Sequence, residues 1–218
     1  MSVNILDNKN QVVAFVNNGN AYDIAKGAWA YYPEQGIDTR ASHADLTDEY
    51  AAIPGELRAV SNHFGKEVLS QIDEADFMAA IPALRQSCGD RAVLRAMHFY
   101  QENARVPLQV AALENGDFDR FLRLVTQSGH SSYMYLQNVI PAGNKIHQEV
   151  AVALGLCEKL LEGRGAYRVH GGGFAGTVQA FVPFDLLDAF RAGIDAVFGD
   201  GACHVLQIRP QGGVEMIP

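Results

Sequence analysis

The chain has 218 residues, of which 48% are hydrophobic and 19% are charged, as expected of a folded globular protein. Its 17 Lys and Arg residues against 25 Asp and Glu residues give a formal net charge of −8 without any basic cluster, which argues against nucleic acid as a partner. No apolar run approaches the roughly 20 residues of a membrane-spanning helix, and the N-terminus lacks the pattern of a secretory signal, so we expect a cytoplasmic protein without membrane contact.

The first part of the chain is expected to be extended. Two short apolar runs, Val3–Leu6 and Val12–Val16, flank a polar stretch and predict a β-hairpin. Further along, Trp29–Tyr32 favours a return to a strand. We treat residues 1–40 as a hairpin and extended segment that continues into a main domain over residues 41–218.

The middle of the chain is predicted to be helical. Apolar residues recur every three or four positions over residues 45–64, although Pro54 is expected to divide this stretch into two helices. The same periodicity predicts a long helix over residues 90–115, then a helix that Asp117 caps. Another helix is expected over residues 145–161.

In the last part of the chain, extended segments return. Residues 166–170 and 177–182 predict two strands on either side of a glycine-rich loop, and the second strand alternates strictly between two sets of side chains. A helix is expected over residues 185–198 and a last strand over residues 203–208. Strands at both ends with a helical block between them predict an α+β fold rather than a repeating βαβ sheet.

Cysteine and histidine usage predicts neither disulfides nor a metal site. The three cysteines, at positions 88, 157 and 203, are odd in number and far apart, which suits thiols in a reducing compartment. The seven histidines do not occur in H-E-x-x-H or another paired spacing typical of metal ligands. His98 and Glu102 share one helical face, which suits either acid–base chemistry or, more commonly, a hydrogen-bonded structural pair.

The loop between the two predicted strands fits the G-x-G-x-x-G pattern of dinucleotide-binding folds. It consists of Gly171, Gly172, Gly173, Phe174, Ala175 and Gly176. In a dinucleotide site the third glycine opens a helix, whereas here a strand, TVQAFV, follows, so that interpretation is rejected. Two interpretations remain open on composition alone: a tight hairpin that binds nothing, or a nest of backbone amides for phosphate oxygens.

The same loop resembles a signature of the GHMP sugar and isoprenoid kinases. Residues 168–176, RVHGGGFAG, are similar to the third signature of that superfamily, in which GGGFGG lies between two strands; Ala175 replaces one glycine. Two further stretches resemble galactokinases within it. These are residues 91–132, with His98, Glu102, Asn103, Arg105, Val106, Ala112, Leu113, Gly116 and Asp117 in the family's order, and residues 43–50, which end on Tyr50. The chain departs from the family at Ser128-Gly129-His130, where a Ser-His pair is usual, and in AAIPGEL, which replaces the arginines after the tyrosine.

This resemblance, which covers residues 38–212, implies a fold and a function. The fold is the C-terminal domain of a GHMP kinase, an antiparallel sheet covered by helices with a ferredoxin-like core and extra helices. The function is that of a galactokinase, which phosphorylates galactose to galactose 1-phosphate with ATP and Mg²⁺. The resemblance makes Tyr50 the sugar-binding residue and residues 171–176 the phosphate loop.

Other galactokinase motifs are absent from the sequence. The chain contains no galactose-binding signature of the GEHTDY kind, no Gly-Leu-Ser-Ser-Ser phosphate loop and no catalytic aspartate beyond it. The resemblance therefore implies a C-terminal half with no catalytic or metal-binding residue and few ligands for ATP or Mg²⁺. We expect the chain to be inactive without an N-terminal galactokinase half, or to self-associate. The alternatives are a non-catalytic sugar- or nucleotide-binding module and a scaffold derived from the fold.

Overall fold

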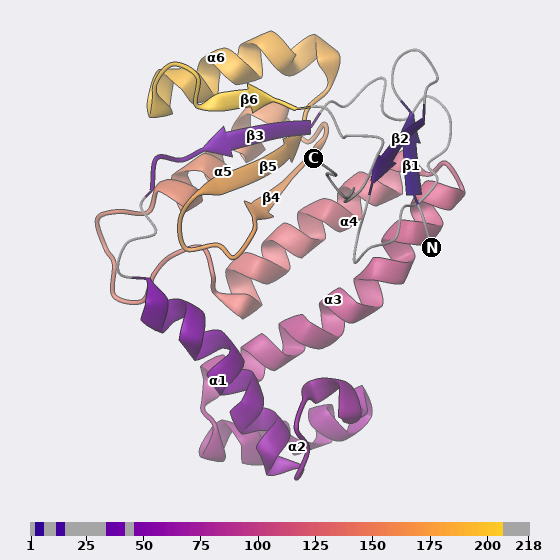
Figure 1. Ribbon diagram of the computed structural model, residues 1–218, viewed down its shortest axis with the longest axis vertical. Helices are drawn as coiled ribbons and strands as arrows, with labels where there is room; N and C mark the ends of the chain where they lie inside the picture. The colour runs from indigo at the N-terminus through magenta and orange to yellow at the C-terminus, as the bar shows by residue number, and fades with distance from the viewer. Residues whose placement is uncertain (1–2, 7–11, 16–33, 42–45, 207–218) are drawn as a thin grey trace, which may run out of the picture.

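The computed structural model, which describes residues 3–6, 12–15, 34–41 and 46–206, contains a four-stranded antiparallel sheet. Its strands follow the order β4-β5-β3-β6 (Figure 1). They are β3 (Glu34–Asp38), β4 (Ala166–His170), β5 (Thr177–Phe181) and β6 (Cys203–Val205). Strands β1 (Val3–Leu6) and β2 (Val12–Phe15) pair separately as an antiparallel hairpin, as predicted.

Strand β3 is the central strand that the sequence pattern did not predict. Ile37 lies opposite Val178 of β5 on one side and Cys203 of β6 on the other, and all three side chains are buried. The stretch EQGID contains Ile37 as its only apolar residue, so it lacks the alternation that marks a half-buried strand. Its position in the sheet comes from pairing on both edges.

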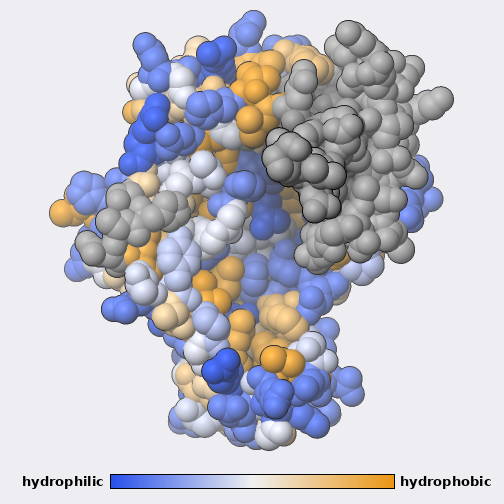
Figure 2. All heavy atoms as spheres, viewed as in Figure 1, coloured by the Kyte–Doolittle hydropathy of each residue, from blue (hydrophilic) through white to orange (hydrophobic). Residues whose placement is uncertain are grey.

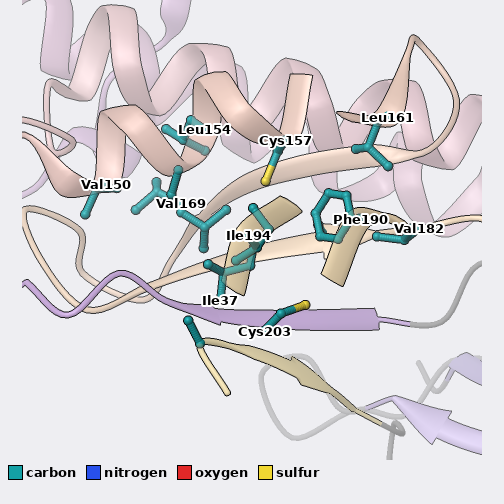
Figure 3. Close-up of a cluster of buried hydrophobic side chains, with 14 of the residues drawn as sticks. Ile37, Val150, Leu154, Cys157, Leu161, Val169, Val182, Phe190, Ile194 and Cys203 are labelled. Atoms are coloured by element: carbon teal, nitrogen blue, oxygen red, sulfur yellow. The ribbon is translucent and has the colours of Figure 1, made fainter. Parts of the chain in front are cut away.

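Helices cover one face of the sheet and form the main core. Helices α5 (Glu149–Leu161) and α6 (Leu187–Phe198) pack on this face, with a short 3₁₀ turn, η4 (Phe184–Leu186), before α6. Figure 3 shows their side chains meeting those of the strands. The core includes Ile37, Val150, Leu154, Cys157, Leu161, Val169, Val182, Phe190, Ile194 and Cys203. Burial raises the pKa of the Cys203 thiol to about 11, so this thiol stays protonated in the core.

A second helical layer extends away from the sheet (Figure 1). It consists of α1 (Thr47–His63), η2 (Leu69–Gln71), α2 (Glu74–Ser87), α3 (Asp90–Glu114) and α4 (Phe118–Ser131). Helices α1, α2 and α3 share a core of their own around Val60, Phe77 and Ala96. Helix α4 joins this layer to the sheet, because it packs on α3 and on β4, and the ring of its Phe121 lies 5.7 Å from the ring of Phe181 at the end of β5.

Three helices differ from the predictions. Helix α1 runs through Pro54 without a break; one lost backbone hydrogen bond is tolerated because the helix buries Val60 against α3. Helix α2, with Pro82 inside it, was not predicted. Helix α5 begins at Glu149 rather than at residue 145, because the Asn144 side chain accepts bonds from two of the backbone amides that follow it.

The remaining predictions agree with the structure where it describes them. Asp117 caps α4, since its carboxylate accepts a bond from the Arg120 amide at 3.0 Å. The predicted strand at Trp29–Tyr32 lies outside the described residues, as does the tail beyond residue 206. The α+β class is confirmed. Among the described residues, no helix is both long and apolar enough to cross a membrane.

Candidate functional site

The glycine-rich loop closes the hairpin between β4 and β5. His170 and Thr177 form the last pair of the ladder, so residues 171–176 make the connection. Gly171, Gly173 and Gly176 have φ angles of 73°, 81° and 83°, in the left-handed region that glycine adopts most easily. The hairpin interpretation of the glycines is therefore correct as far as the backbone is concerned.

Tyr50, in the first turns of α1, lies against this loop. Its hydroxyl donates a hydrogen bond of 2.6 Å to the Gly173 carbonyl, and its ring meets Phe174 edge-on at 5.4 Å. A Cβ atom at Gly172 would lie 2.8 Å from the Tyr50 ring, so only glycine allows this approach. Partial burial raises the pKa of Tyr50, which keeps the hydroxyl protonated as a donor.

Asn138 also holds the loop in place. This residue is 3% exposed; its side-chain amide donates to the Gly172 carbonyl at 3.1 Å, and its backbone carbonyl accepts from the Phe174 amide at 2.5 Å. A Cβ atom at Gly173 would lie 2.1 Å from the same Asn138 carbonyl. Two successive glycines are thus required by two different neighbours, Tyr50 and Asn138.

Thr39 anchors the far end of the loop. Its backbone amide and its hydroxyl both donate to the Gly176 carbonyl, at 3.0 Å and 2.7 Å, and the residue is fully buried. Because Thr39 directly follows β3, the unpredicted central strand positions one support of the site. Asn138 and Thr39 carry no recognisable sequence signal, and sequence reasoning missed both.

Only part of the loop is exposed to solvent. Gly171 and Gly172 are exposed, whereas Gly173, Phe174 and Ala175 are buried against Tyr50 and Asn138. The exposed backbone at Gly171 and Gly172 fits a contact with a phosphate oxygen, but it is too small to cradle a triphosphate. Among the described residues, no group of three or more His, Cys, Asp and Glu side chains could hold a metal ion.

A buried arginine, paired with a partly exposed glutamate, holds the segment that carries Asn138. A π-helix, η3 (Ser132–Leu136), ends α4, and Gln137 then takes a left-handed conformation at φ 56°. Arg95 of α3, 1% exposed, donates to the Leu136 carbonyl at 3.0 Å and to the Glu56 carboxylate at 2.9 Å. Burial lowers the pKa of Arg95, and the charge of Glu56 opposes that effect.

His98 and Glu102 make structural hydrogen bonds rather than a pair with each other. His98 Nδ1 lies 2.9 Å from the Ser131 hydroxyl, and the Ser128 hydroxyl donates to Glu102 at 2.6 Å. Both serines belong to α4, so the two side chains join α3 to α4. His130, where the chain departs from the galactokinase pattern, instead meets the Tyr167 ring at 6.4 Å in a cavity of about 310 Å³ between α4 and α5.

Comparisons with known proteins find galactokinases. No family model matches the chain. The galactokinases of Glaesserella parasuis and Mannheimia succiniciproducens are 28% and 27% identical to it over 155 residues, which are 71% of this chain and 38% of each relative. That of Haemophilus influenzae is 26% identical over the same length. The chain therefore spans well under half the length of the curated relatives it matches.

A solved structure shows the same fold. The crystal structure of Lactococcus lactis galactokinase complexed with galactose aligns with a TM-score of 0.64 and 23% identity, and the alignment covers 88% of this chain and 49% of that one. The predicted resemblance to galactokinases is confirmed, and the partial coverage agrees with a C-terminal half. The roles of Tyr50 and of residues 171–176 stay predictions.

Proposed function

We propose that this chain acts as the C-terminal half of a galactokinase-like sugar kinase. One observation carries the proposal: the two stretches that resemble galactokinase motifs, far apart in the sequence, meet at the 2.6 Å bond between Tyr50 and Gly173. A packing role alone does not require the motif tyrosine and the motif glycines to contact each other. Their contact supports a shared site, with the sugar beside Tyr50 and a phosphate group beside Gly171 and Gly172.

The proposed reaction transfers the γ-phosphoryl group of ATP to galactose. The anomeric hydroxyl oxygen forms a bond to the γ-phosphorus, the bond from that phosphorus to the leaving ADP oxygen breaks, and the hydroxyl proton passes to a base. Phosphoryl transfer depends mainly on positioning and charge neutralisation. In this chain Tyr50 positions the sugar and the exposed loop amides face a phosphate oxygen, whereas the base and the Mg²⁺ ligands come from an N-terminal half.

Reconstitution tests this proposal. The purified chain is mixed with ATP, Mg²⁺ and galactose, with and without the N-terminal half of a related galactokinase, and galactose 1-phosphate is measured. We expect product only when both halves are present. Product from the chain alone would show that the division of roles is wrong. Galactose binding by the chain in calorimetry, without turnover in either mixture, would instead support the non-catalytic binding module.

A tyrosine variant tests the role of the contact itself. Tyr50→Phe keeps the ring against Gly172 but removes the hydroxyl that donates to Gly173. In the reconstituted mixture we expect the specificity constant kcat/KM for galactose to fall about tenfold, as one lost positioning hydrogen bond predicts. Tyr133→Phe is the matched control, because Tyr133 is 44% exposed and lines the cavity between α4 and α5. Equal effects of the two variants would contradict the assignment of Tyr50.

A further inference from the structure

A polar cluster between α3, α4 and β4 contains a carboxylate that already has an ion-pair partner and a hydrogen-bond donor. Glu102 of α3 forms an ion pair with Arg105 and accepts the hydrogen bond of Ser128 from α4. The Arg105 and Glu102 side chains are only 11% and 25% exposed. Arg105 therefore neutralises the negative charge of Glu102. Glu102 has no further charge that could neutralise a second cation.

Arg168 of β4 adds a second cation to this cluster. Gly129 of α4 allows the helix to approach β4 closely, since a Cβ atom there would lie 3.0 Å from the Arg168 Cβ atom. The half-buried Arg168 guanidinium donates to the adjacent Val169 carbonyl at 3.1 Å. Within the described part of the chain, no carboxylate lies within ion-pair distance of it.

Among the residues that the structure describes, the charges of the cluster do not balance. Burial lowers the pKa of both Arg168 and Arg105, and for Arg105 the neighbouring charge of Arg168 adds to the effect. Burial and these two arginines together lower the pKa of His98 to about 4, so at neutral pH the imidazole carries no charge. In the described part of the chain, two cations and one carboxylate thus share a partly buried place, where an unpaired charge costs free energy.

Arg168 also shares a face of the sheet with His170, the residue directly before the glycine-rich loop. Residues of one strand that are two apart share a face, so Arg168 and His170 point to the same side. His170 bonds across the hairpin to Thr177, at the start of the loop connection. Figure 2 shows hydrophilic residues in a hollow in the middle of the molecule, between the sheet and α3.

We propose that Arg168, with Arg105 beside it, binds the phosphate group of a ligand. A guanidinium presents two parallel N–H donors that match two oxygens of a phosphate. A bound dianion compensates the positive charge that Glu102 leaves unmatched, and the neutral His98 adds no repulsion to a cation. The proposed donors are the two guanidinium groups rather than the backbone amides of Gly171 and Gly172, and the proposal does not require that the chain be a kinase.

The test uses the full chain and no enzymatic activity. Inorganic phosphate and Mg²⁺-free ATP are titrated separately into the protein at pH 7, by calorimetry and by NMR of the His98 imidazole. We expect binding with a dissociation constant of about 1 mM or tighter, together with a shift of the His98 signals. Tighter binding of ATP than of phosphate assigns the site to a nucleotide phosphate, and equal binding assigns it to free phosphate. No binding of either at concentrations of about 10 mM overturns the proposal.

Two arginine variants separate a specific site from general electrostatic attraction. Arg168→Gln is expected to weaken binding at least about tenfold, as loss of a charge-assisted phosphate contact predicts. Arg191→Gln removes the same charge from an exposed position on α6, 55% accessible, and is expected to leave binding within about twofold. If Arg168→Gln does not fold, Arg168→Lys, which keeps the charge but not the two parallel donors, takes its place with the same expected loss. Equal binding by the wild type and the Arg168 variant would indicate an adventitious ion only and would overturn the proposal.

Discussion

At the scale of single residues, the environment of His98 predicts a pH dependence of stability. Burial first, then the charges of Arg168 and Arg105, lower its pKa from an ordinary value of 6.5 to about 4. Between these two values the unfolded chain binds a proton that the folded chain does not. Stability is therefore complete above about pH 6.5 and falls as the pH drops toward 4.

Replacement of His98 tests this dependence. His98→Gln lacks the titrating group, so the urea midpoint should fall less between pH 7 and pH 5 in this variant than in the wild type. His147→Gln is the control, because the His147 side chain is 74% exposed. The same pH dependence in all three proteins would contradict the assigned cause.

Two glycines of the loop provide a second test at this scale. Gly171 and Gly173 both have positive φ angles, so an alanine at either position is strained by a similar amount. A Cβ atom at Gly173 would also lie 2.1 Å from the Asn138 carbonyl, whereas nothing lies within 4 Å of one at Gly171. Gly171→Ala should cost about 1 kcal/mol of unfolding free energy and Gly173→Ala about 3 kcal/mol or more. Chemical denaturation measures the difference, and equal costs would mean that the loop is not held by Asn138.

At the scale of secondary structure elements, Gly129 sets the distance between α4 and β4. A Cβ atom at this position would lie 2.9 Å from the Tyr167 carbonyl and 3.0 Å from the Arg168 Cβ atom, neither of which moves freely. Gly129→Ala should therefore destabilise the protein by about 1–3 kcal/mol, despite the better helix propensity of alanine.

Gly155 of α5 is the matched control for this prediction. It is also a helical glycine, but it is exposed and nothing lies within 4 Å of an added Cβ atom. Gly155→Ala should stabilise the protein by up to about 1 kcal/mol through helix propensity alone. Opposite signs of the two changes in thermal unfolding are expected; stabilisation by both would show that α4 and β4 are not in close contact at Gly129.

The sequence predicts elements with a regular apolar pattern and misses those whose position comes from distant partners. The strands around the loop and the long helix α3 have clear periodicity, and all three lie close to their predicted bounds. Strand β3 has only Ile37 as an apolar residue, and it forms through pairing with β5 and β6. Local pattern cannot reveal such pairing, because the partners lie more than a hundred residues away in the chain.

The candidate site was predictable to a similar extent. The motif resemblance identified Tyr50 and the glycines, and the structure brings them into contact. Asn138 was not found, since it follows a π-helix and a left-handed Gln137, and neither has a local sequence signature. Arg95 was not found either, because a buried arginine on a helix has the same pattern as an exposed one. Tertiary contacts determine which residues hold a loop in place, and the local pattern of a single sequence does not reveal these contacts.

At the scale of the whole molecule, the chain spans only 38% of the length of the first galactokinases it matches and 49% of the solved one. If the proposed function is correct, an N-terminal half should bind the folded chain and stabilise it. A partner that binds only the folded state raises the unfolding free energy by about 2.7 kcal/mol when its free concentration is a hundred times the dissociation constant. The alternative partner is a second copy of the chain, and the two make different predictions for the melting temperature Tm.

Thermal unfolding at several concentrations separates these partners. With the N-terminal half of a related galactokinase in excess, we expect Tm to rise with the concentration of that half and to depend little on the concentration of the chain itself. Self-association alone predicts the reverse, a Tm that rises with the chain's own concentration and ignores the added half. Galactose should raise Tm further only when both halves are present, because the proposed sugar site needs groups from each. A Tm that responds to none of these additions would leave the scaffold as the function that fits this fold.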